Sequence, residues 1–216
     1  MSSPNPILRH HDWYLSDDMS IFLVENRLFR IHQYFLVQNS PVLRDMFTLP
    51  LNVSDNDKDK EIEGSLDSKP ISLPGVTILE FESLLKFFHQ SMLDNFSMPV
   101  ESWVALLSIS HRFDIANICT RAIEMVFSET SPLDAVEQTV IATKFDIPAH
   151  HLFHAAKELI ERSHPLDVQE IDQMSSDMIF RISTGREEYI RWTMRPKAQN
   201  SDFDTKIRAI LSASNA

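Results

Sequence analysis

The residues whose types and spacing suggest chemistry are three histidines in the segment HHLFH, His150, His151 and His154. In a helix, His150 and His154 would share one face, which is the spacing of a pair of zinc ligands. The segment lacks the glutamate of the HExxH motif, and no convincing third ligand follows downstream. A metal-dependent hydrolase using these histidines is therefore kept as an alternative hypothesis. The favoured interpretation is a set of surface histidines on a helix.

Other reactive groups give no pattern of catalysis. Cys119 is the single cysteine, so it has no disulfide partner within the chain, and its apolar helical surroundings favour a small buried hydrophobe. Asp55 and Asp59 lie in a polar stretch where solvation explains them. The sequence has no G-x-S-x-G elbow, no phosphate loop and no Cys-x-x-Cys pair, and it contains only 3 glycines. We therefore predict no enzyme activity, no catalytic residue, no cofactor and no metal.

Composition limits the class of partner. The 216 residues suffice for one sizeable domain with a helical extension, and 43% hydrophobic residues indicate a globular chain. The net charge of −11 repels phosphates, so nucleic acid and anionic membranes are not expected as partners. No apolar run approaches the roughly 20 residues of a transmembrane helix, and the N-terminus lacks a signal-like apolar core. We expect an intracellular protein, with cytoplasm and nucleus both open.

Two short apolar runs, residues 21–24 and 28–31, are separated by only three residues. Such a short connection predicts an antiparallel hairpin. Asn26 in the connection tolerates the positive φ that tight turns need. Phe29 and Ile31 alternate onto one face of the second strand. That face needs a cover, because an isolated hairpin is not stable in water.

The hydrophobic spacing becomes helical directly after the hairpin. Between residues 35 and 47 the apolar side chains at this spacing are Phe35, Leu36, Val42, Leu43, Met46 and Phe47. Ser40 stands at an N-cap position, with Pro41 at the first helical position. His32, between strand and helix, is interpreted as a hydrogen-bonded structural histidine. We expect two short helices that cover one face of the hairpin.

Further elements follow along the chain. Residues 71–73 predict a third strand, and Thr77 with Glu80 has the spacing of a capping box at the next helix start. Later helices are predicted at 103–113, 114–127, 132–145, 149–163, 167–173 and 175–193. The polar tail after residue 195 has enough apolar spacing for one last amphipathic helix containing Phe203, Ile207, Ile210 and Leu211.

The ordered residues of the hairpin and the two helices resemble the signature of the BTB/POZ family. The matching positions are Asp18, Ile21–Val24, Phe29, His32, Phe35, Leu36, Ser40, Val42, Met46 and Phe47. This resemblance implies an α+β fold, with a helical cluster flanking a short sheet and an all-helical extension behind it. Within the family, the sequence most resembles the small single-module BTB proteins of fungi. The implied organisation is a flexible arm at 1–11, a BTB/POZ domain at 12–130 with an inserted mobile loop at 51–70, a truncated BACK-like extension at 131–195 and a polar tail at 196–216.

The same resemblance implies a protein-interaction module that forms a homodimer. Aromatic side chains are enriched at protein interfaces. The interface candidates are Trp13, Tyr14, Leu15, Ile21 and Leu23, although packing within their own domain is the alternative for each. Residue types alone leave both readings open.

Two family roles stay open, a substrate adaptor for cullin-type ubiquitin ligases and a scaffold for transcription-related assemblies. The sequence departs from both patterns. Cullin-binding relatives often carry an apolar-x-Glu motif before the third strand, but Gly64 stands two positions after Ile62. Transcription-related relatives often have a basic residue after the histidine, and here it is Gln33. A purely helical structural protein is the remaining alternative.

Overall fold

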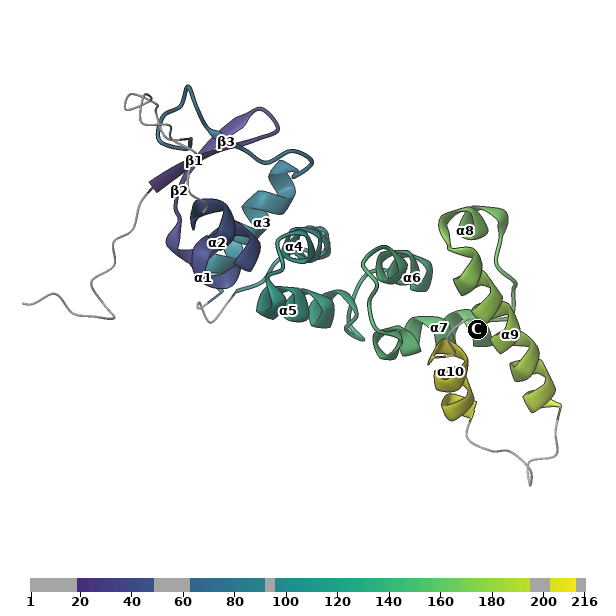
Figure 1. Ribbon diagram of the computed structural model, residues 1–216. Coiled ribbons are helices and arrows are strands. Elements are labelled where there is room, and N and C mark those ends of the chain that lie inside the picture. Colours follow the sequence, from purple (N-terminus) through teal and green to yellow (C-terminus); the bar gives the residue numbers. More distant parts are fainter. Residues whose placement is uncertain (1–18, 49–62, 92–95, 195–202, 213–216) are drawn as a thin grey trace, which may run out of the picture.

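The computed structural model describes residues 19–48, 63–91, 96–194 and 203–212. A small sheet with helices packed against it comes first, and a row of helices follows it (Figure 1). The elements in chain order are β1 (Met19–Val24), β2 (Arg27–His32), α1 (Tyr34–Asn39), α2 (Pro41–Thr48), β3 (Ile71–Ser72), α3 (Ile78–Gln90), α4 (Val100–Arg112), α5 (Ala116–Val126), α6 (Ala135–Lys144), the 3₁₀ helix η1 (Ala149–Leu152), α7 (Phe153–Glu161), α8 (Val168–Gln173), α9 (Ser176–Thr193) and α10 (Phe203–Ser212). The predicted α+β class is confirmed.

The sheet has the strand order β2-β1-β3, with β1 in the centre. Strand β1 is antiparallel to β2 and parallel to β3, so the predicted hairpin and third strand are confirmed. The turn differs from the prediction, because the positive φ falls on Glu25, at 52°, and not on Asn26. The Glu25 carboxylate accepts a hydrogen bond from the backbone N–H of Ile78 at 3.3 Å. This contact at the N-terminus of α3 offsets the strain of a left-handed glutamate.

The core of the first part is built around Phe22 in the central strand. Phe22 is fully buried, and its ring lies 6.2 Å from that of Phe47 on α2 and 5.7 Å from that of Phe81 on α3. The Phe81 ring also packs edge-on against Phe29 of β2 at 5.0 Å. The inner face of the hairpin is therefore covered by helices, as the sequence predicted. Leu36 of α1 is buried in the same core.

The predicted solvated loop over 51–70 is anchored to the sheet at Gly64, while residue 63 and residues 65–68 are exposed. The backbone of Gly64 is buried, with φ at +84°, and its carbonyl accepts a hydrogen bond from the N–H of Ile21 at 2.8 Å. A Cβ at this position would lie 2.7 Å from Cδ1 of Ile71. Gly64 thus allows the chain to approach β1 closely, which a side chain would prevent. The first part of the predicted loop, 51–62, lies outside the described residues.

Two helices end in the same turn, which the sequence prediction missed. Asp114 after α4 and Asp146 after α6 both have positive φ, at 51° and 50°. In each turn the next residue is a buried isoleucine whose N–H bonds back into the preceding helix, Ile115 to Ser110 at 2.8 Å and Ile147 to Ala142 at 2.9 Å. This is the Schellman geometry of a helix C-terminus. The predicted helix start at Asp114 is therefore wrong, and α5 begins at Ala116.

The capping box predicted for Thr77 and Glu80 is confirmed, because the Glu80 N–H bonds to the Thr77 hydroxyl at 3.2 Å and the Thr77 N–H bonds to the Glu80 carboxylate at 2.7 Å. The extension contains two further boxes, Asp134 with Glu137 and Asp167 with Glu170. Each satisfies two N–H groups that the first helical turn leaves without partners.

The extension packs α7 against both α9 and α10. Gly185 of α9 is buried where Ile160 of α7 crosses it, and a Cβ on Gly185 would lie 2.5 Å from Cδ1 of Ile160. Three side chains of α10 are buried, namely Phe203, Ile207 and Leu211. The segment predicted as a polar tail, 196–216, therefore contains a packed helix at 203–212. This is the amphipathic helix that the apolar spacing predicted. It is anchored by an ion pair between Lys157 and Asp204 at 2.6 Å.

A shielded ion pair joins α7 to α8. The Arg162 guanidinium donates to both carboxylate oxygens of Glu170, one at 2.8 Å, and both side chains are largely covered. These hydrogen bonds, with that from the Asp167 N–H, hold the pKa of Glu170 at about 2, against an ordinary value of 4.5. A folded-state pKa below the unfolded one contributes stability above pH 4.5, which is lost as the pH falls toward 2.

Replacing Arg162 by methionine is expected to flatten the pH dependence of stability in this window. The free-energy difference between native chain and variant should be largest near pH 7 and should shrink below pH 4, as measured by urea unfolding at each pH. Arg121→Met is the matched control, because its pair with Glu124 is more than half exposed and contributes little. If the free energies of unfolding of the native chain and of Arg162→Met differ by the same amount at every pH, Arg162 is not the cause of the low pKa of Glu170.

Candidate protein-interaction surfaces

The outer face of the β-hairpin carries exposed apolar side chains beside the exposed Arg30 and His32. Leu23 of β1 lies opposite Leu28 of β2, and Met19 lies opposite His32, so these side chains share the face that points away from Phe22. Leu28 is 46% exposed and Met19 is 37% exposed, while Leu23 is half-buried. Neighbouring apolar side chains on an open sheet face are a feature of surfaces that bind other proteins.

The predicted interface residues are only partly placed by the structure. Ile21 lies on the outer face but is 5% exposed within its own chain, so it has little area left for a partner. Leu23 keeps part of its surface available. Trp13, Tyr14 and Leu15 lie outside the described residues. Sequence reasoning missed Leu28 and Met19. The predicted three-residue connection would pair Leu28 with Val24, whereas the two-residue turn in the structure pairs Leu28 with Leu23.

Ser40 has two roles, of which the sequence indicated one. Its hydroxyl oxygen accepts a hydrogen bond from the N–H of Leu43 at 3.0 Å, which confirms the predicted N-cap of α2. The same hydroxyl donates to the carbonyl of Phe113 at 2.6 Å, at the end of α4. A fully buried serine thus joins two elements 73 positions apart. His32 is exposed at the end of β2, and Asp18 lies outside the described residues.

The three histidines of HHLFH do not form one helical face. His150 and His151 lie in η1, where their rings are 4.1 Å apart, and His154 lies in the first turn of α7. The exposed His154 imidazole lies 3.6 Å from the carboxylate of Glu129. Burial, with the neighbouring His150, lowers the pKa of His151. Across the described ranges, no three side chains of metal-ligating type are close enough to hold an ion.

Cys119 is half-buried on α5, and burial raises the pKa of its thiol. A hydrogen bond with Ser110 acts in the opposite direction, but burial is the larger effect. A raised pKa keeps the sulfur protonated near neutral pH, and the thiol is a much weaker nucleophile than the thiolate. This environment fits the predicted packing role of the residue.

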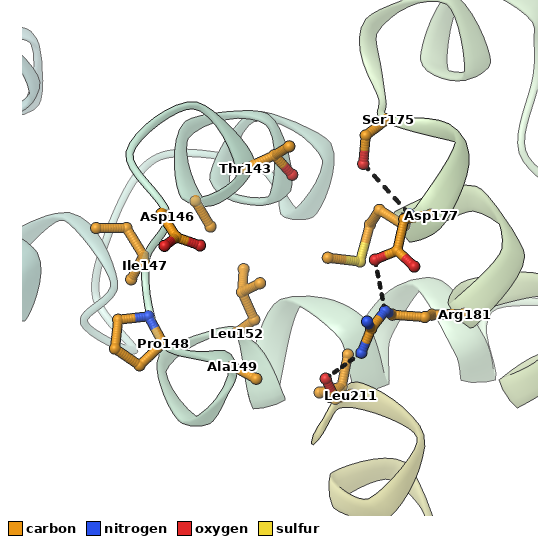
Figure 2. A pocket seen from close by; sticks show the side chains of 12 residues that line it. Thr143, Asp146, Ile147, Pro148, Ala149, Leu152, Ser175, Asp177, Arg181 and Leu211 are labelled. Carbon is orange, nitrogen blue, oxygen red and sulfur yellow. Dashed lines mark hydrogen bonds and ion pairs between the residues drawn. The ribbon is translucent and has the colours of Figure 1, made fainter. Parts of the chain in front are cut away.

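A pocket of about 440 Å³ lies between α6, η1, α9 and α10 (Figure 2). Asp146 lies on one side and Arg181 on the other, with the apolar Leu152 between them. The Arg181 guanidinium bonds to the carboxylate of Asp177 at 2.7 Å and also donates to the carbonyls of Ile210 and Leu211. Those bonds satisfy carbonyls at the C-terminal end of α10, so Arg181 fastens that helix. The pocket wall is structural, without a nucleophile and base in contact.

The arrangement of a three-stranded sheet, covering helices and a helical extension permits comparison with known proteins. The family model described as BTB/POZ domain matches residues 15–129, from just before β1 to just after α5. This match covers more than half of the chain. The chain belongs to the BTB/POZ family. Domains of this family are interaction modules that mediate self-association and the binding of other proteins. A search of curated proteins gave no match.

The BTB/POZ signature residues now have physical roles. Leu36 and Ser40 are buried, Phe29 and Phe47 are partly buried and pack against the core, and the Ser40 hydroxyl joins the start of α2 to the end of α4. None of the helices in the described ranges combines the length and hydrophobicity needed to cross a bilayer.

Proposed function

We propose that this BTB/POZ protein self-associates through its N-terminal region and recruits other proteins without catalysing a reaction. The observation that carries the proposal is the group of accessible apolar side chains on the outer face of the hairpin, where Leu23 lies opposite Leu28 and Met19 lies further along the same face. Trp13, Tyr14 and Leu15 come directly before β1 in the sequence and supply the kind of side chain found at interface centres. A homodimer would remove both groups from water.

The recruitment of other proteins is proposed in one of two roles. The chain is either a substrate adaptor of a cullin-type ubiquitin ligase or a transcription-related scaffold. The extension behind α5 supplies a second surface, so one copy can hold a partner while its N-terminal region contacts another copy. Mixing the purified chain with a purified cullin and measuring co-elution separates the two. Co-elution at micromolar concentration supports the adaptor, and separate elution supports the scaffold.

Leu28→Glu is expected to weaken self-association about tenfold or more, because it places a charge among the apolar side chains of the outer face. Leu28 is 46% exposed, so the substitution should leave folding unchanged. Val42→Glu is the matched control. Val42 is equally exposed, on α2, which packs against the opposite face of the sheet through Phe47. Light scattering measures the mass of each variant. An equal effect of both substitutions, or of neither, would argue against this interface.

A further inference from the structure

The C-terminal helices expose an unusual number of large apolar side chains. Of the ten exposed in the described part of the chain, five lie between residues 168 and 194: Val168, Ile171, Phe180, Ile190 and Met194. Phe180 is 66% exposed and Met194 78%. The cluster lies on α8 and α9, away from the sheet and its outer face (Figure 1).

One stripe of exposed side chains on α9 and its C-cap follows the spacing of a helix–helix seam, and the exposed Arg191 and Thr193 do not belong to it. Ser176, Phe180, Ser183, Glu187, Ile190 and Met194 recur at intervals of four, three, four, three and four residues. This alternation keeps one stripe of a helix facing a second helix along its whole length. Within its own chain, α9 buries the other side, with Met178, Ile182 and Gly185. The stripe therefore has no function in the packing of the extension.

A groove runs along one flank of this stripe. It has a volume of about 400 Å³. Its apolar lining includes Leu166, Ile171, Ile179 and Ile190, and its polar lining is Ser183, Arg186 and Glu187. Phe180 projects from the same exposed face of α9, about 15 Å from Ile190 along the helix axis. A projecting ring and a groove with several apolar lining residues on one face make that face complementary to itself.

The order of residues along the stripe fits an antiparallel copy of α9. A twofold axis opposite position 185 places Phe180 against the partner's Ile190 and Ser176 against the partner's Met194. The same axis places Ser183 against the partner's Glu187. Each apolar ring then lies beside the partner's groove, and the serine hydroxyl can donate to the glutamate carboxylate. Glu187 is already paired with Arg191 at 2.9 Å, so its charge is balanced at the contact.

We propose that α9 is a second self-association surface, at which two copies of the chain pack antiparallel along the Phe180–Ile190 stripe. The polar layer of Ser183 and Glu187 sets the register, as single polar positions do in paired helices. This contact is separate from the N-terminal interface. A chain with two different twofold contacts links its copies into larger assemblies instead of stopping at a dimer.

The contact is small, because one 18-residue helix with a neighbouring groove offers limited area. We therefore expect association in the micromolar range. Each copy carries a net charge of −11, so salt that screens the repulsion should strengthen the contact.

Sedimentation velocity tests the contact over about 1 to 100 µM, the range in which small interfaces dissociate. The full chain carries Trp13→Ala/Tyr14→Ala in this experiment, so that self-association through the N-terminal region contributes least to the measured mass. We expect the mass to rise with concentration, and Phe180→Glu to weaken this association at least tenfold. Leu79→Glu, an exposed leucine on α3, is the control and should have no effect.

A cross-linking experiment tests the register. In a Cys119→Ser background, Ser183→Cys chains mixed with Glu187→Cys chains are expected to form a mixed disulfide faster than either forms with itself. Association that Phe180→Glu leaves unchanged, or a mixed disulfide no faster than the others, would overturn the α9 contact. If Phe180→Glu abolishes association in the native background while Leu28→Glu does not, the N-terminal proposal fails and the α9 contact stands.

Discussion

Replacing Phe22 by alanine is expected to lower the free energy of unfolding of the BTB/POZ domain by about 3–5 kcal/mol, the usual cost of removing a buried aromatic ring. Phe22 is 0% exposed in the central strand and contacts rings from α2 and α3. Without its ring, the surfaces of both helices face a cavity that the two-sided packing prevents from collapsing. Urea unfolding followed by circular dichroism measures the change.

Leu28→Ala is the control for this substitution, because Leu28 belongs to the same hairpin but points to the outer face and is 46% exposed. It should cost less than about 1 kcal/mol. A similar loss for both variants would mean that the two faces of the hairpin are not distinguished by burial, and the assignment of the core would be wrong.

Gly185→Ala is expected to destabilise the extension by about 1–3 kcal/mol, although alanine is the better helix former. The new Cβ would lie 2.5 Å from Cδ1 and 2.8 Å from Cγ1 of Ile160, a buried side chain that cannot move aside freely. In an Ile160→Ala background both atoms are absent, so Gly185→Ala should stabilise the chain by up to about 1 kcal/mol.

The change in stability caused by Gly185→Ala is thus expected to reverse its sign when Ile160 is removed. Such a reversal shows that α7 approaches α9 closely at this glycine, because a general effect on α9 would be the same in both backgrounds. Ser183→Ala, on the exposed side of the same helix, is measured below the concentration at which α9 associates. There it changes only helix propensity and should stabilise slightly in both backgrounds. Thermal unfolding of the four combinations of Gly185 and Ile160 measures the coupling. Equal effects of Gly185→Ala in the two backgrounds would show that α7 and α9 do not meet at this glycine.

The sequence predicted the elements whose signals are local. The hairpin, the N-cap at Ser40, the capping box at Thr77 and the order of helices in the extension follow from spacing and from residues near each other in the chain. What it missed depends on distant partners. Glu25 has the positive φ, and its carboxylate accepts a hydrogen bond from Ile78, a residue 53 positions away.

The two helix-ending turns show a signal that was present but overlooked. The tripeptide Phe-Asp-Ile occurs at 113–115 and again at 145–147, and both copies fold identically, with the aspartate left-handed and the isoleucine buried. A left-handed aspartate is tolerated because its short polar side chain can bond locally. The 3₁₀ helix η1 begins directly after the second of these turns and Pro148, and it contains His150 and His151, whereas His154 lies in α7.

The candidate surfaces were less accessible to sequence reasoning than the fold. Ile21 belongs to an apolar run like Leu23, and only the packed chain shows that Ile21 is covered while Leu28 is open. The stripe on α9 has a regular spacing, but nothing in the sequence tells which helical faces the extension already uses. Exposure is a property of the whole packed chain, so both surfaces required the structure.

The most direct test of N-terminal self-association is the solution mass of the full chain in the Phe180→Glu background, measured by light scattering with and without Trp13→Ala/Tyr14→Ala. We expect a mass of twice 24.9 kDa for Phe180→Glu alone and a shift toward 24.9 kDa when both aromatic residues are removed. A mass of 24.9 kDa for Phe180→Glu at every micromolar concentration, or a dimer that the aromatic substitutions leave unchanged, would contradict the proposal.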